Sequence, residues 1–460
     1  MFGLMVVVFV LGYFAIALEH PIKIDKAASA LITGVVTWTI LALGADMLVD
    51  TNSSSYHDFL MDATSNHNSP VYYVVHELRH HLGEIAEILF FLLGAMTIVE
   101  LIDAHEGFNV ITDRIKTNDK VKLIWIISLL TFFFSAALDN LTTSIVMISL
   151  LRKLIENKQD RWLFAGVVVI AANAGGAWSP IGDVTTTMLW IGGQITATNI
   201  IWQLMLPSFV CLLVPLLILT FRLKGEIVRP RLTGGLHGIE NPTTSIERNS
   251  IFFLGVALLL FVPIFKTWTH LPPYMGMLFG LGILWVVTEI MHGDKNREHK
   301  NSLSVIGVLQ KVDVPSVLFF LGILIAIASL QTAGHLVLMA NWLKDTLGDV
   351  YSINMVIGML SAIVDNVPLV AASQGMYTVT PPEAYATATE WQGYFKEDGI
   401  FWEFLAYCAG TGGSALIIGS AAGVAVMGLE KIDFVWYLKK ISLLALCGYF
   451  AGAMVYIFMV

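Results

Sequence analysis

Residues Ser135–Ser144 read SAALDNLTTS, and they interrupt a segment that is otherwise apolar. The stretch brings together the carboxylate of Asp139, the amide of Asn140 and the hydroxyls of Thr142 and Thr143. At membrane depth an ionisable group costs on the order of several kcal/mol unless water, a partner or a bound ion offsets that cost. The stretch is therefore a first candidate for a functional site.

The same arrangement occurs a second time in the chain. Residues Ser361–Leu369 read SAIVDNVPL, with Asp365 and Asn366 at the places that Asp139 and Asn140 hold in the first copy. Two copies of one costly motif predict a single site that two halves of the chain build together.

The composition is typical of a membrane protein. The chain has 460 residues, of which 56% are hydrophobic and only 13% are charged, which is too apolar for an ordinary soluble domain. The formal net charge of −9 argues against nucleic acid as a partner. The three cysteines lie inside apolar segments, and we interpret them as buried free thiols.

Apolar stretches predict membrane spans and two helical hairpins. We place the spans at about 2–19, 27–48, 82–102, 162–191, 203–222, 250–266, 274–291, 315–333, 400–428 and 436–459. The hairpins are 123–155 and 351–377, and their limbs of about 12–16 residues reach roughly 18–24 Å, short of a hydrocarbon core of about 30 Å. We therefore expect both hairpins to be re-entrant. The amphipathic segments 103–120 and 334–350 are predicted to lie along the membrane surface.

The positive charges predict the orientation of the spans. All but four of the 26 Lys and Arg residues fall in one set of alternate loops, which marks these loops as cytoplasmic and both termini as external. The first hairpin then opens from the cytoplasm and the second from outside, so the two halves form an inverted repeat. Inverted repeats are typical of secondary transporters that work by alternating access.

The expected fold is an all-α polytopic membrane protein with an inverted repeat, two re-entrant hairpins and two broken helices. A cytoplasmic linker separates the repeats, and each repeat consists of scaffold spans followed by a hairpin and a broken helix. The expected boundaries are 1–223 for the first repeat (scaffold 1–122, hairpin and broken helix 123–223), 224–248 for the linker, and 249–460 for the second repeat (scaffold 249–350, hairpin and broken helix 351–460).

A second pair of motifs lies in the broken spans. Residues 173–183 read NAGGAWSPIGD, and residues 410–420 read GTGGSALIIGS. Glycine pairs in mid-span, with Pro180 after the first pair, predict that the helix unwinds there. Unwound backbone inside a membrane is tolerated where it lines a cavity or meets a ligand. The polar side chains that it offers are those of Asn173, Ser179, Thr411 and Ser414.

The predicted site is rich in oxygen atoms and carries negative charge. Such groups suit a small hard cation and repel an anion. Burial and mutual repulsion favour protonation of the two tip acids, so protons and the cation compete for the same oxygens. The alternative interpretation is that Asp139 and Asp365 only cap the half-helices that follow them. Asp183 is compatible with both capping and ligation.

Other ionisable residues have more than one interpretation. Glu100 is compatible with a proton relay and with a solvated helix end. His76, His80 and His81, together with Glu77, are interpreted as surface residues, with pH sensing and a metal site as the alternatives.

At these motifs the chain resembles the NhaD-type sodium/proton antiporters of the ion-transporter superfamily. The resemblance covers nearly the whole chain and rests on LDNLTT at 138–143, on 173–183, on VDNVP at 364–368 and on GTGGS at 410–414. It implies a dicarboxylate-symporter-like architecture and the export of Na⁺ or Li⁺ in exchange for protons, without a cofactor. It also implies elevator-type movement, a homodimer and a location in the bacterial inner (cytoplasmic) membrane.

The two pairs of motifs, read together with the resemblance, predict which residues form the site. The implied cation and proton site contains Asp139, Asn140, Thr142, Thr143, Asn173, Ser179, Asp183, Asp365, Asn366, Thr411 and Ser414. The expected Na⁺ ligands among them are Asp139, Asn140, Asn173, Asp365, Asn366 and Thr411.

Two other classes of function compete with this interpretation. An anion carrier for dicarboxylates or arsenite would share the fold, but relatives that carry dicarboxylates have Ser-Asn-Thr where this chain has Asp139-Asn140 and Asp365-Asn366. A membrane enzyme is the second rival, and the sequence contains neither a Gly-x-Ser-Gly motif nor a nucleotide-binding Gly-rich loop. We therefore predict a secondary transporter and not an enzyme.

Overall fold

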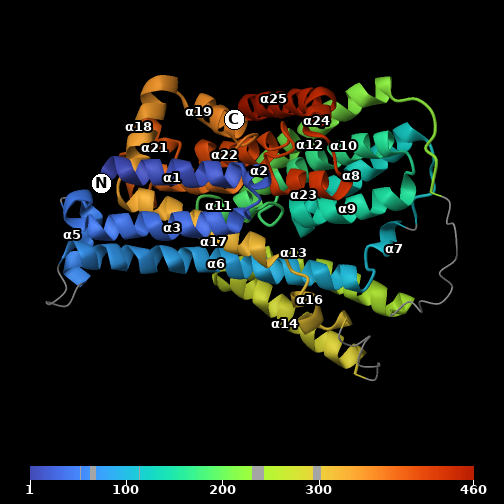
Figure 1. Ribbon diagram of the computed structural model, residues 1–460, viewed down its shortest axis with the longest axis horizontal. Coiled ribbons are helices and arrows are strands. Elements are labelled where there is room, and N and C mark those ends of the chain that lie inside the picture. Colours follow the sequence, from blue (N-terminus) through green and yellow to red (C-terminus); the bar gives the residue numbers. More distant parts are fainter. Residues whose placement is uncertain (52, 63–68, 113, 231–242, 294–301) are drawn as a thin grey trace. The chain divides into compact units, whose positions relative to one another are not determined.

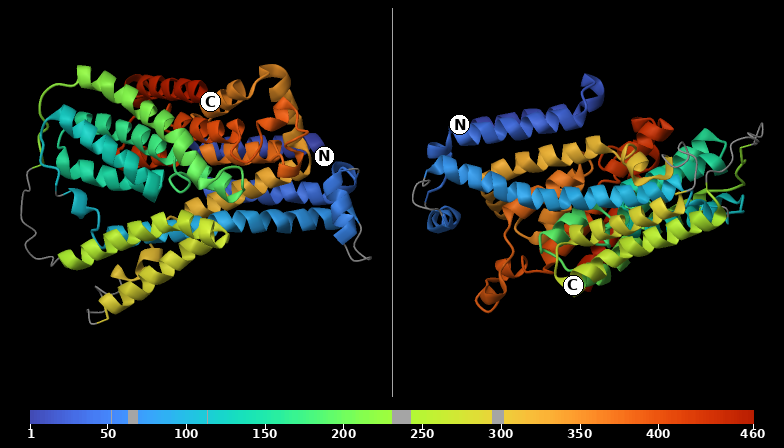
Figure 2. Two further views of the ribbon diagram at one scale, coloured as in Figure 1. Left: turned by 180° about the vertical axis from the view of Figure 1, so that it is seen from behind. Right: turned by 90° about the horizontal axis from the view of Figure 1, so that it is seen from below.

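The computed structural model describes residues 1–51, 53–62, 69–112, 114–230, 243–293 and 302–460. Within these ranges the chain is helical and forms no strand beyond isolated bridges (Figures 1 and 2). Eight of the described helices are long and apolar enough to cross a membrane. The expectation of an all-helical, multi-pass membrane protein is confirmed.

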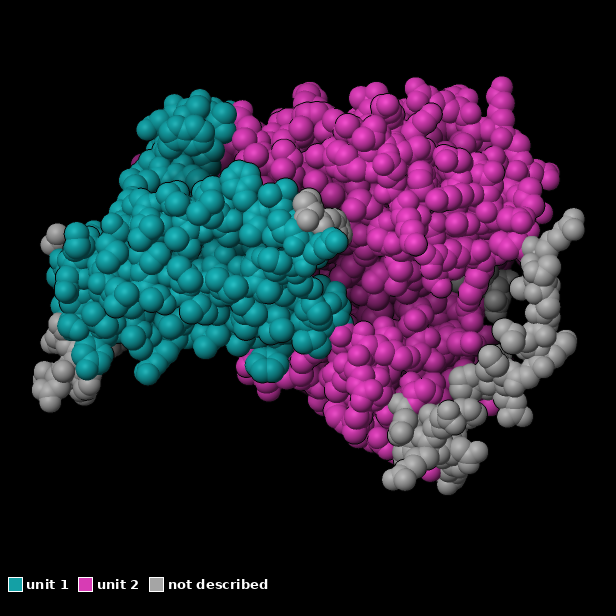
Figure 3. Space-filling view, in the orientation of Figure 1, with its two compact units in different colours: residues 1–90, 313–349, 367–379 teal, residues 91–312, 350–366, 380–460 magenta. Residues whose placement is uncertain are grey.

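The chain divides into two compact units (Figure 3). Unit 1 comprises Met1–Phe90, Asp313–Asp349 and Val367–Val379. Unit 2 comprises Phe91–Val312, Val350–Asn366 and Thr380–Val460.

Unit 1 is built from apolar helices that pack side by side. Its central helix, α3 (Lys26–Leu43), contacts α1 (Phe2–Ala17) and α17 (Val314–Thr332). The indole of Trp38 donates to the carbonyl of Ile325 at 2.8 Å, which ties α3 to α17. The unit also contains α2 (Glu19–Ile22), α4 (Ala45–Leu48), α5 (Ser54–Asp62), α18 (His335–Leu347), the first part of α6 (Pro70–Ala104) and α20 (Asn366–Met376) after its first residue.

Unit 2 is built around α10 (Lys158–Ala177), which is buried without interruption from Phe164 to Ala177. A helix that is apolar on all sides is typical of such a central position. Its neighbours are α8 (Lys120–Leu138), α9 (Asn140–Leu154), α12 (Ala197–Arg222), α22 (Ile400–Gly412) and α23 (Ala421–Glu430). In the same unit α25 (Ser442–Met459) packs on α12, and α13 (Ser245–Thr269) runs beside α14 (Pro273–Met291) (Figure 2). The remaining elements are α7 (Asn109–Thr112), α11 (Val184–Ile191), α16 (Val305–Leu309), α19 (Val350–Leu360), η1 (Pro382–Ala384), α21 (Glu390–Gly393) and α24 (Phe434–Lys440).

One hairpin limb is longer than expected. Helices α9, α19 and α20 have 15, 11 and 11 residues, so these three limbs are short, as predicted. Helix α8 has 19 residues because the side chain of Asp119 caps it at Lys120, and it spans about 28 Å. The expectation that this limb is too short to cross a membrane is therefore wrong.

The ends of α6 differ from the predicted span 82–102. The helix begins at Pro70, so the last part of the predicted external loop 50–81 is helical. Glu106 has the left-handed φ of +56°, and the N–H of Gly107 donates to the carbonyl of Ile102 at 2.8 Å. A left-handed residue with such a hydrogen bond is a common way for a helix to end. The expectation of one amphipathic helix over 103–120 is wrong, since the described part of that segment holds the end of α6, the short helix α7 and the first residue of α8. The one expected over 334–350 is α18.

The glycine pairs lie at the ends of the helices that precede the breaks, and the predicted place of unwinding is wrong by a few residues. Helix α10 continues through both glycines to Ala177, and α22 ends at Gly412. A Cβ on Gly175 would lie 2.2 Å from the carbonyl oxygen of Phe132, and a Cβ on Gly412 would lie 2.0 Å from that of Gly358. These glycines therefore allow two backbones to approach closely, and the unwound stretch follows them.

The two copies of the motif make the same local contacts in unit 2. The hydroxyl of Ser135 donates to the carbonyl of Ala172 at 2.5 Å, and the hydroxyl of Ser361 donates to the carbonyl of Ala409 at 2.9 Å. In each copy, therefore, the limb before the tip is fastened to the first half of a broken helix by a serine at the same place.

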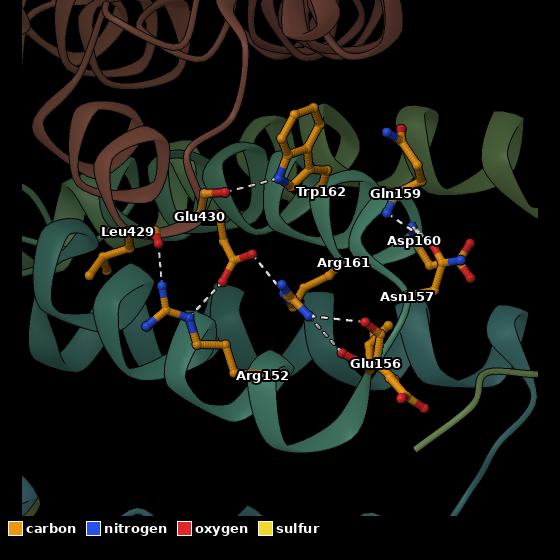
Figure 4. A network of polar contacts seen from close by, with 10 residues as sticks. Arg152, Glu156, Asn157, Gln159, Asp160, Arg161, Trp162, Leu429 and Glu430 are labelled. Carbon is orange, nitrogen blue, oxygen red and sulfur yellow. Dashed lines mark hydrogen bonds and ion pairs between the residues drawn. The ribbon is translucent and has the colours of Figure 1, made fainter. Parts of the chain in front are cut away.

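An ion-pair network joins the ends of three helices in unit 2 (Figure 4). The carboxylate of Glu430, whose side chain is only 1% exposed, accepts from Nε of Arg152 at 2.7 Å and from Nε of Arg161 at 2.6 Å. The backbone carbonyl of Glu430 also accepts from the indole of Trp162 at 3.0 Å. The network fastens the end of α23 to the end of α9 and the start of α10.

Candidate ion-binding site

The first hairpin tip is a single residue between two helices. Asp139 separates α8 from α9 and has φ +85°, a conformation that costs a non-glycine residue on the order of 1–3 kcal/mol. Its carboxylate accepts from the backbone N–H of Thr142 at 2.8 Å and from the hydroxyl of Thr142 at 2.7 Å. Asp139 therefore does cap α9, as the alternative interpretation held. Strained backbone of this kind is concentrated at functional sites.

The two tips meet at the carboxylate of Asp183. The amide of Asn140, from the first tip, donates to Asp183 Oδ2 at 2.6 Å. The amide of Asn366, from the second tip, lies 3.4 Å from both carboxylate oxygens of Asp183. Asp183 is 1% exposed and also caps α11, because its Oδ1 accepts from the backbone N–H of Thr185 at 2.9 Å. The two sequence motifs thus share one polar centre at Asp183. This residue both caps α11 and contacts the two tips.

A second hub, Asn173, joins the broken helices to the first tip. Its Oδ1 accepts from the amide of Asn140 at 3.1 Å. Its own amide donates to the hydroxyl of Ser414 at 3.0 Å and to that of Ser420 at 2.9 Å. Asn173 is fully buried, so each of these hydrogen bonds replaces one that water would otherwise make.

Four half-helices begin at this site. Helix α9 begins after Asp139, α11 after Asp183, α20 after Asp365 and α23 after Ser420. Each N-terminus carries about half a positive charge, which stabilises a nearby carboxylate. These N-termini therefore offset part of the negative charge of nearby carboxylates. The carboxylates of Asp139 and Asp365 both lie near enough to that of Asp183 to repel it.

Several oxygen atoms of the site remain available to a ligand. None of the described hydrogen bonds uses the Oδ1 atoms of Asn140 and Asn366. The hydroxyl of Thr143 is buried and has no hydrogen-bond partner in the described part of the chain. Thr142, Ser179 and Thr411 donate their hydroxyl protons to oxygens 2.5–2.7 Å away. Among the described hydrogen bonds, none joins Ser179 or Thr411 to the polar centre around Asp183, so their place in the site stays a prediction.

The structure adds Ser420 to the residues that the sequence predicted. It caps α23 and holds Asn173, and it stands where Asp183 stands in the first copy. The match between 173–183 and 410–420 already aligned these two residues. Serine is uncharged and common, so nothing else in the sequence marks Ser420 as part of the site.

Glu100 lies apart from this network. It is half-buried, and its electrostatic neighbours are Asp103 and Lys311. Among the described hydrogen bonds, none connects it to either tip. Its role as a proton relay stays a prediction.

The histidine cluster on α6 contains a pattern known from metal enzymes. Residues 76–80 read HELRH, the His-Glu-x-x-His spacing of zinc peptidases. Nδ1 of His81 lies 3.2 Å from Glu84 and its Nε2 lies 3.8 Å from Glu77, so these acids pair with imidazoles on their own helix. No group of three or more metal-binding side chains occurs in the described ranges. The metal interpretation of the cluster therefore gains no support from the structure.

Hairpin tips and broken helices that meet around the buried carboxylate of Asp183, in a bundle of apolar spans, define a membrane transporter of the ion-transporter fold. Among solved structures, the YdaH transporter of Alcanivorax borkumensis matches with a TM-score of 0.52 at 12% identity, over 93% of this chain and 97% of that chain. At that identity the likeness concerns the fold alone, and it confirms the expected architecture.

The sequence comparisons identify the family. The citrate transporter (CitMHS) family model matches residues 6–391. The chain is 44% identical to "Sodium/proton antiporter 1" of Arabidopsis thaliana, over 98% of this chain and 72% of that protein. It is 42% identical to "Sodium/proton antiporter 2" of the same plant over 98% of each chain. It is 31% identical to "Na(+)/H(+) antiporter NhaD" of Alkalimonas amylolytica over 83% of this chain and 79% of that protein. The chain therefore belongs to the citrate transporter family, as a member of the NhaD-type group of the ion-transporter superfamily.

Proposed function

We propose that the protein exports Na⁺ or Li⁺ in exchange for protons, and that Asp183 lies at the centre of the ion site. The observation that carries this proposal is the convergence of Asn140 and Asn366 on the Asp183 carboxylate. An ion bound to this carboxylate would lie next to both tips, so its binding would affect both halves of the chain. The names of the relatives support the same activity.

The charge of the site supports a cation as cargo. The site contains the carboxyl groups of Asp139, Asp183 and Asp365, and helix N-termini offset only part of their negative charge, so the site suits a cation. The oxygens of Asn140, Asn366 and Thr143 are hard ligands of the kind that suit such an ion. The family description names citrate, but an anion carrier would have to place its substrate beside Asp139, Asp183 and Asp365. The negative charge of these three acids therefore argues against an anion as the transported substrate.

Exchange follows from competition for the same oxygens. In the proposed cycle Na⁺ enters from the cytoplasm and displaces protons from Asp139, Asp183 and Asp365. The loaded site then becomes accessible from outside, where protons replace Na⁺, and the protonated site returns. Elevator-type movement, a homodimer, external termini and the bacterial inner membrane complete the proposal, on the strength of the inverted repeat, the positive charges and the resemblance.

Everted membrane vesicles test the proposal directly. Addition of Na⁺ to vesicles with an imposed proton gradient is expected to release protons for the wild type, measured by a pH-sensitive dye. Asp139→Asn and Asp365→Asn are expected to abolish this response, because each removes a charge that the cation needs. Asp345→Asn is the matched control, because Asp345 is an exposed aspartate of α18 outside the site. Full Na⁺-dependent activity in either tip variant would remove that residue from the site.

The same vesicles discriminate between the two kinds of cargo. The antiporter proposal expects no uptake of labelled citrate by the wild type. Citrate uptake that survives Asp139→Asn and Asp365→Asn, without any Na⁺-dependent proton release, would replace the proposal with an anion carrier.

A further inference from the structure

An apolar cavity of about 480 Å³ lies in unit 2 behind the first hairpin tip. One wall is the end of α8, including Leu138, which directly precedes Asp139. A second wall is the helix break at Trp178 and Pro180, and the facing wall is α13 with Val256. The cavity thus lies between the backbone that positions the tip and a membrane-spanning helix.

The cavity is bounded in part by exposed apolar side chains. Three of its lining side chains, Phe133, Leu260 and Ile264, are 49%, 50% and 60% exposed. Leu260 and Ile264 belong to α13, which is long and apolar enough to cross a membrane. Around such a helix the solvent is the hydrocarbon of lipid tails, so lipid tails are the medium with access to the cavity.

The chemistry of the walls selects an apolar occupant. The lining is almost entirely aliphatic and aromatic. Its polar side-chain groups are the hydroxyl of Ser179, which donates to the carbonyl of Ala136 at 2.5 Å, and the indole N–H of Trp178, which has no hydrogen-bond partner in the described part of the chain. Water occupies a cavity only where it finds two to four polar partners, whereas apolar cavities take up apolar guests. A volume of this size falls within the range of ligand sites in proteins.

We propose that this cavity binds an acyl chain of a bilayer lipid. The acyl chain fills the space between α13 and the tip, and it keeps water from reaching Asp139 from the membrane side. The binding site is a property of the walls alone and does not depend on which ion the protein carries.

Contact between the acyl chain and Trp178 can be measured by fluorescence. The purified protein is reconstituted in phosphatidylcholine vesicles with plain or brominated acyl chains, since bromine quenches an indole that it touches. The contribution of Trp178 is the difference between the wild type and Trp178→Phe. Brominated chains are expected to lower this contribution by about twofold or more, because the chain lies in contact with the indole, while aqueous acrylamide leaves it nearly unchanged. Stronger quenching by acrylamide, or no quenching by either agent, would overturn the proposal.

A substitution that fills the cavity gives the matched test. Val256→Phe occupies part of the cavity from α13 and is expected to relieve the bromine quenching of Trp178 at least in part. Ala257→Phe adds the same side chain at the next residue, which is exposed and does not line the cavity, and it is expected to leave the quenching unchanged. Thermal unfolding shows that each variant is folded, and Leu260→Phe replaces Val256→Phe if the latter is not. Equal quenching in the filled variant and the control would place the chain elsewhere and overturn the proposal.

Discussion

Asp183 and Ser420 hold matching positions in the two copies of the helix break. Each caps the second half of a broken helix, and each accepts a hydrogen bond from an asparagine of the site. The repeat is therefore symmetric in shape and asymmetric in charge, because the first copy has a carboxylate where the second has a hydroxyl. The site consequently holds three acids and not four.

Asp183→Asn is expected to weaken Na⁺ binding strongly. A hydrogen bond to a charged group contributes roughly 1.5–3 kcal/mol, and Asp183 receives amides from both tips, so the KM for Na⁺ should rise about tenfold or more. Na⁺ titrations of proton release in everted vesicles measure the change, with Asp345→Asn as the control. An unchanged KM would show that Asp183 only caps α11.

Ser420→Ala is expected to have a smaller effect of the same kind. Asn173 keeps its hydrogen bond to Ser414 and loses the one to Ser420, which corresponds to about 0.5–1.5 kcal/mol, or a rise of roughly two- to tenfold in the KM for Na⁺. The maximal rate should change less than the KM, and Ser420→Thr should restore both because it keeps the hydroxyl. A loss that Ser420→Thr does not rescue would point to packing and not to the hydrogen bond.

Glu430→Gln is expected to destabilise the protein. The change leaves Arg152 and Arg161 without their shared counter-charge, and breaking a fully buried pair costs about 3–5 kcal/mol. The side chains of Arg152 and Arg161 are 48% and 20% exposed, so we expect a smaller loss of about 2 kcal/mol. Thermal unfolding in detergent measures the effect. The exposed Glu383→Gln should leave the unfolding temperature unchanged, and equal stability of the two variants would contradict the prediction.

Gly412→Ala is expected to destabilise the second broken helix. Its Cβ would lie 2.0 Å from the carbonyl oxygen of Gly358, so the two backbones must separate, at a cost of about 1–3 kcal/mol or more. Gly428→Ala is the control, because a Cβ on this glycine of α23 meets nothing within 4 Å. The control should be neutral or slightly more stable than the wild type. Comparable unfolding temperatures for the two variants would mean that the close approach is easily relaxed.

Acidification is expected to raise the KM for Na⁺. In the proposed exchange protons and Na⁺ compete for the oxygens of Asp139, Asp183 and Asp365, so we expect a lower pH to fill the site with protons and to raise the Na⁺ concentration needed for half-maximal exchange. Na⁺ titrations at a series of pH values measure this dependence. A KM that stays constant with pH, while only the maximal rate changes, would exclude direct competition.

The sequence predicted the spans and the tips because both depend on strong local signals. Long apolar runs mark membrane spans, and a paired Asp-Asn inside such a run is rare unless it has a function. Asp139 and Asp365 do precede the second limbs of two hairpins. The start of α8 was harder to predict, because a cap by Asp119 extended the helix into a polar stretch. The end of α6 depended on a left-handed residue, Glu106, that no apolar pattern marks.

The remaining parts of the site depended on contacts between distant segments. Gly175 is explained by the carbonyl of Phe132, a neighbour in space that the local sequence does not reveal, so the glycine pair was interpreted as the place of unwinding. Asp183 was equally compatible with capping and ligation until the positions of Asn140 and Asn366 were known. The sequence repeat aligned Ser420 with Asp183, but its contact with the site became evident from its hydrogen bond to Asn173.

The close backbone contacts at Gly175 and Gly412 have a mechanical consequence. With no side chain between a hairpin limb and its broken helix, the two pieces of main chain cannot slide or hinge independently without losing contact along their length. In the proposed transport cycle we therefore expect each limb to move together with its broken helix. A larger side chain at either glycine would push the two backbones apart. We therefore expect it to slow transport even though the ligands of the ion are unchanged.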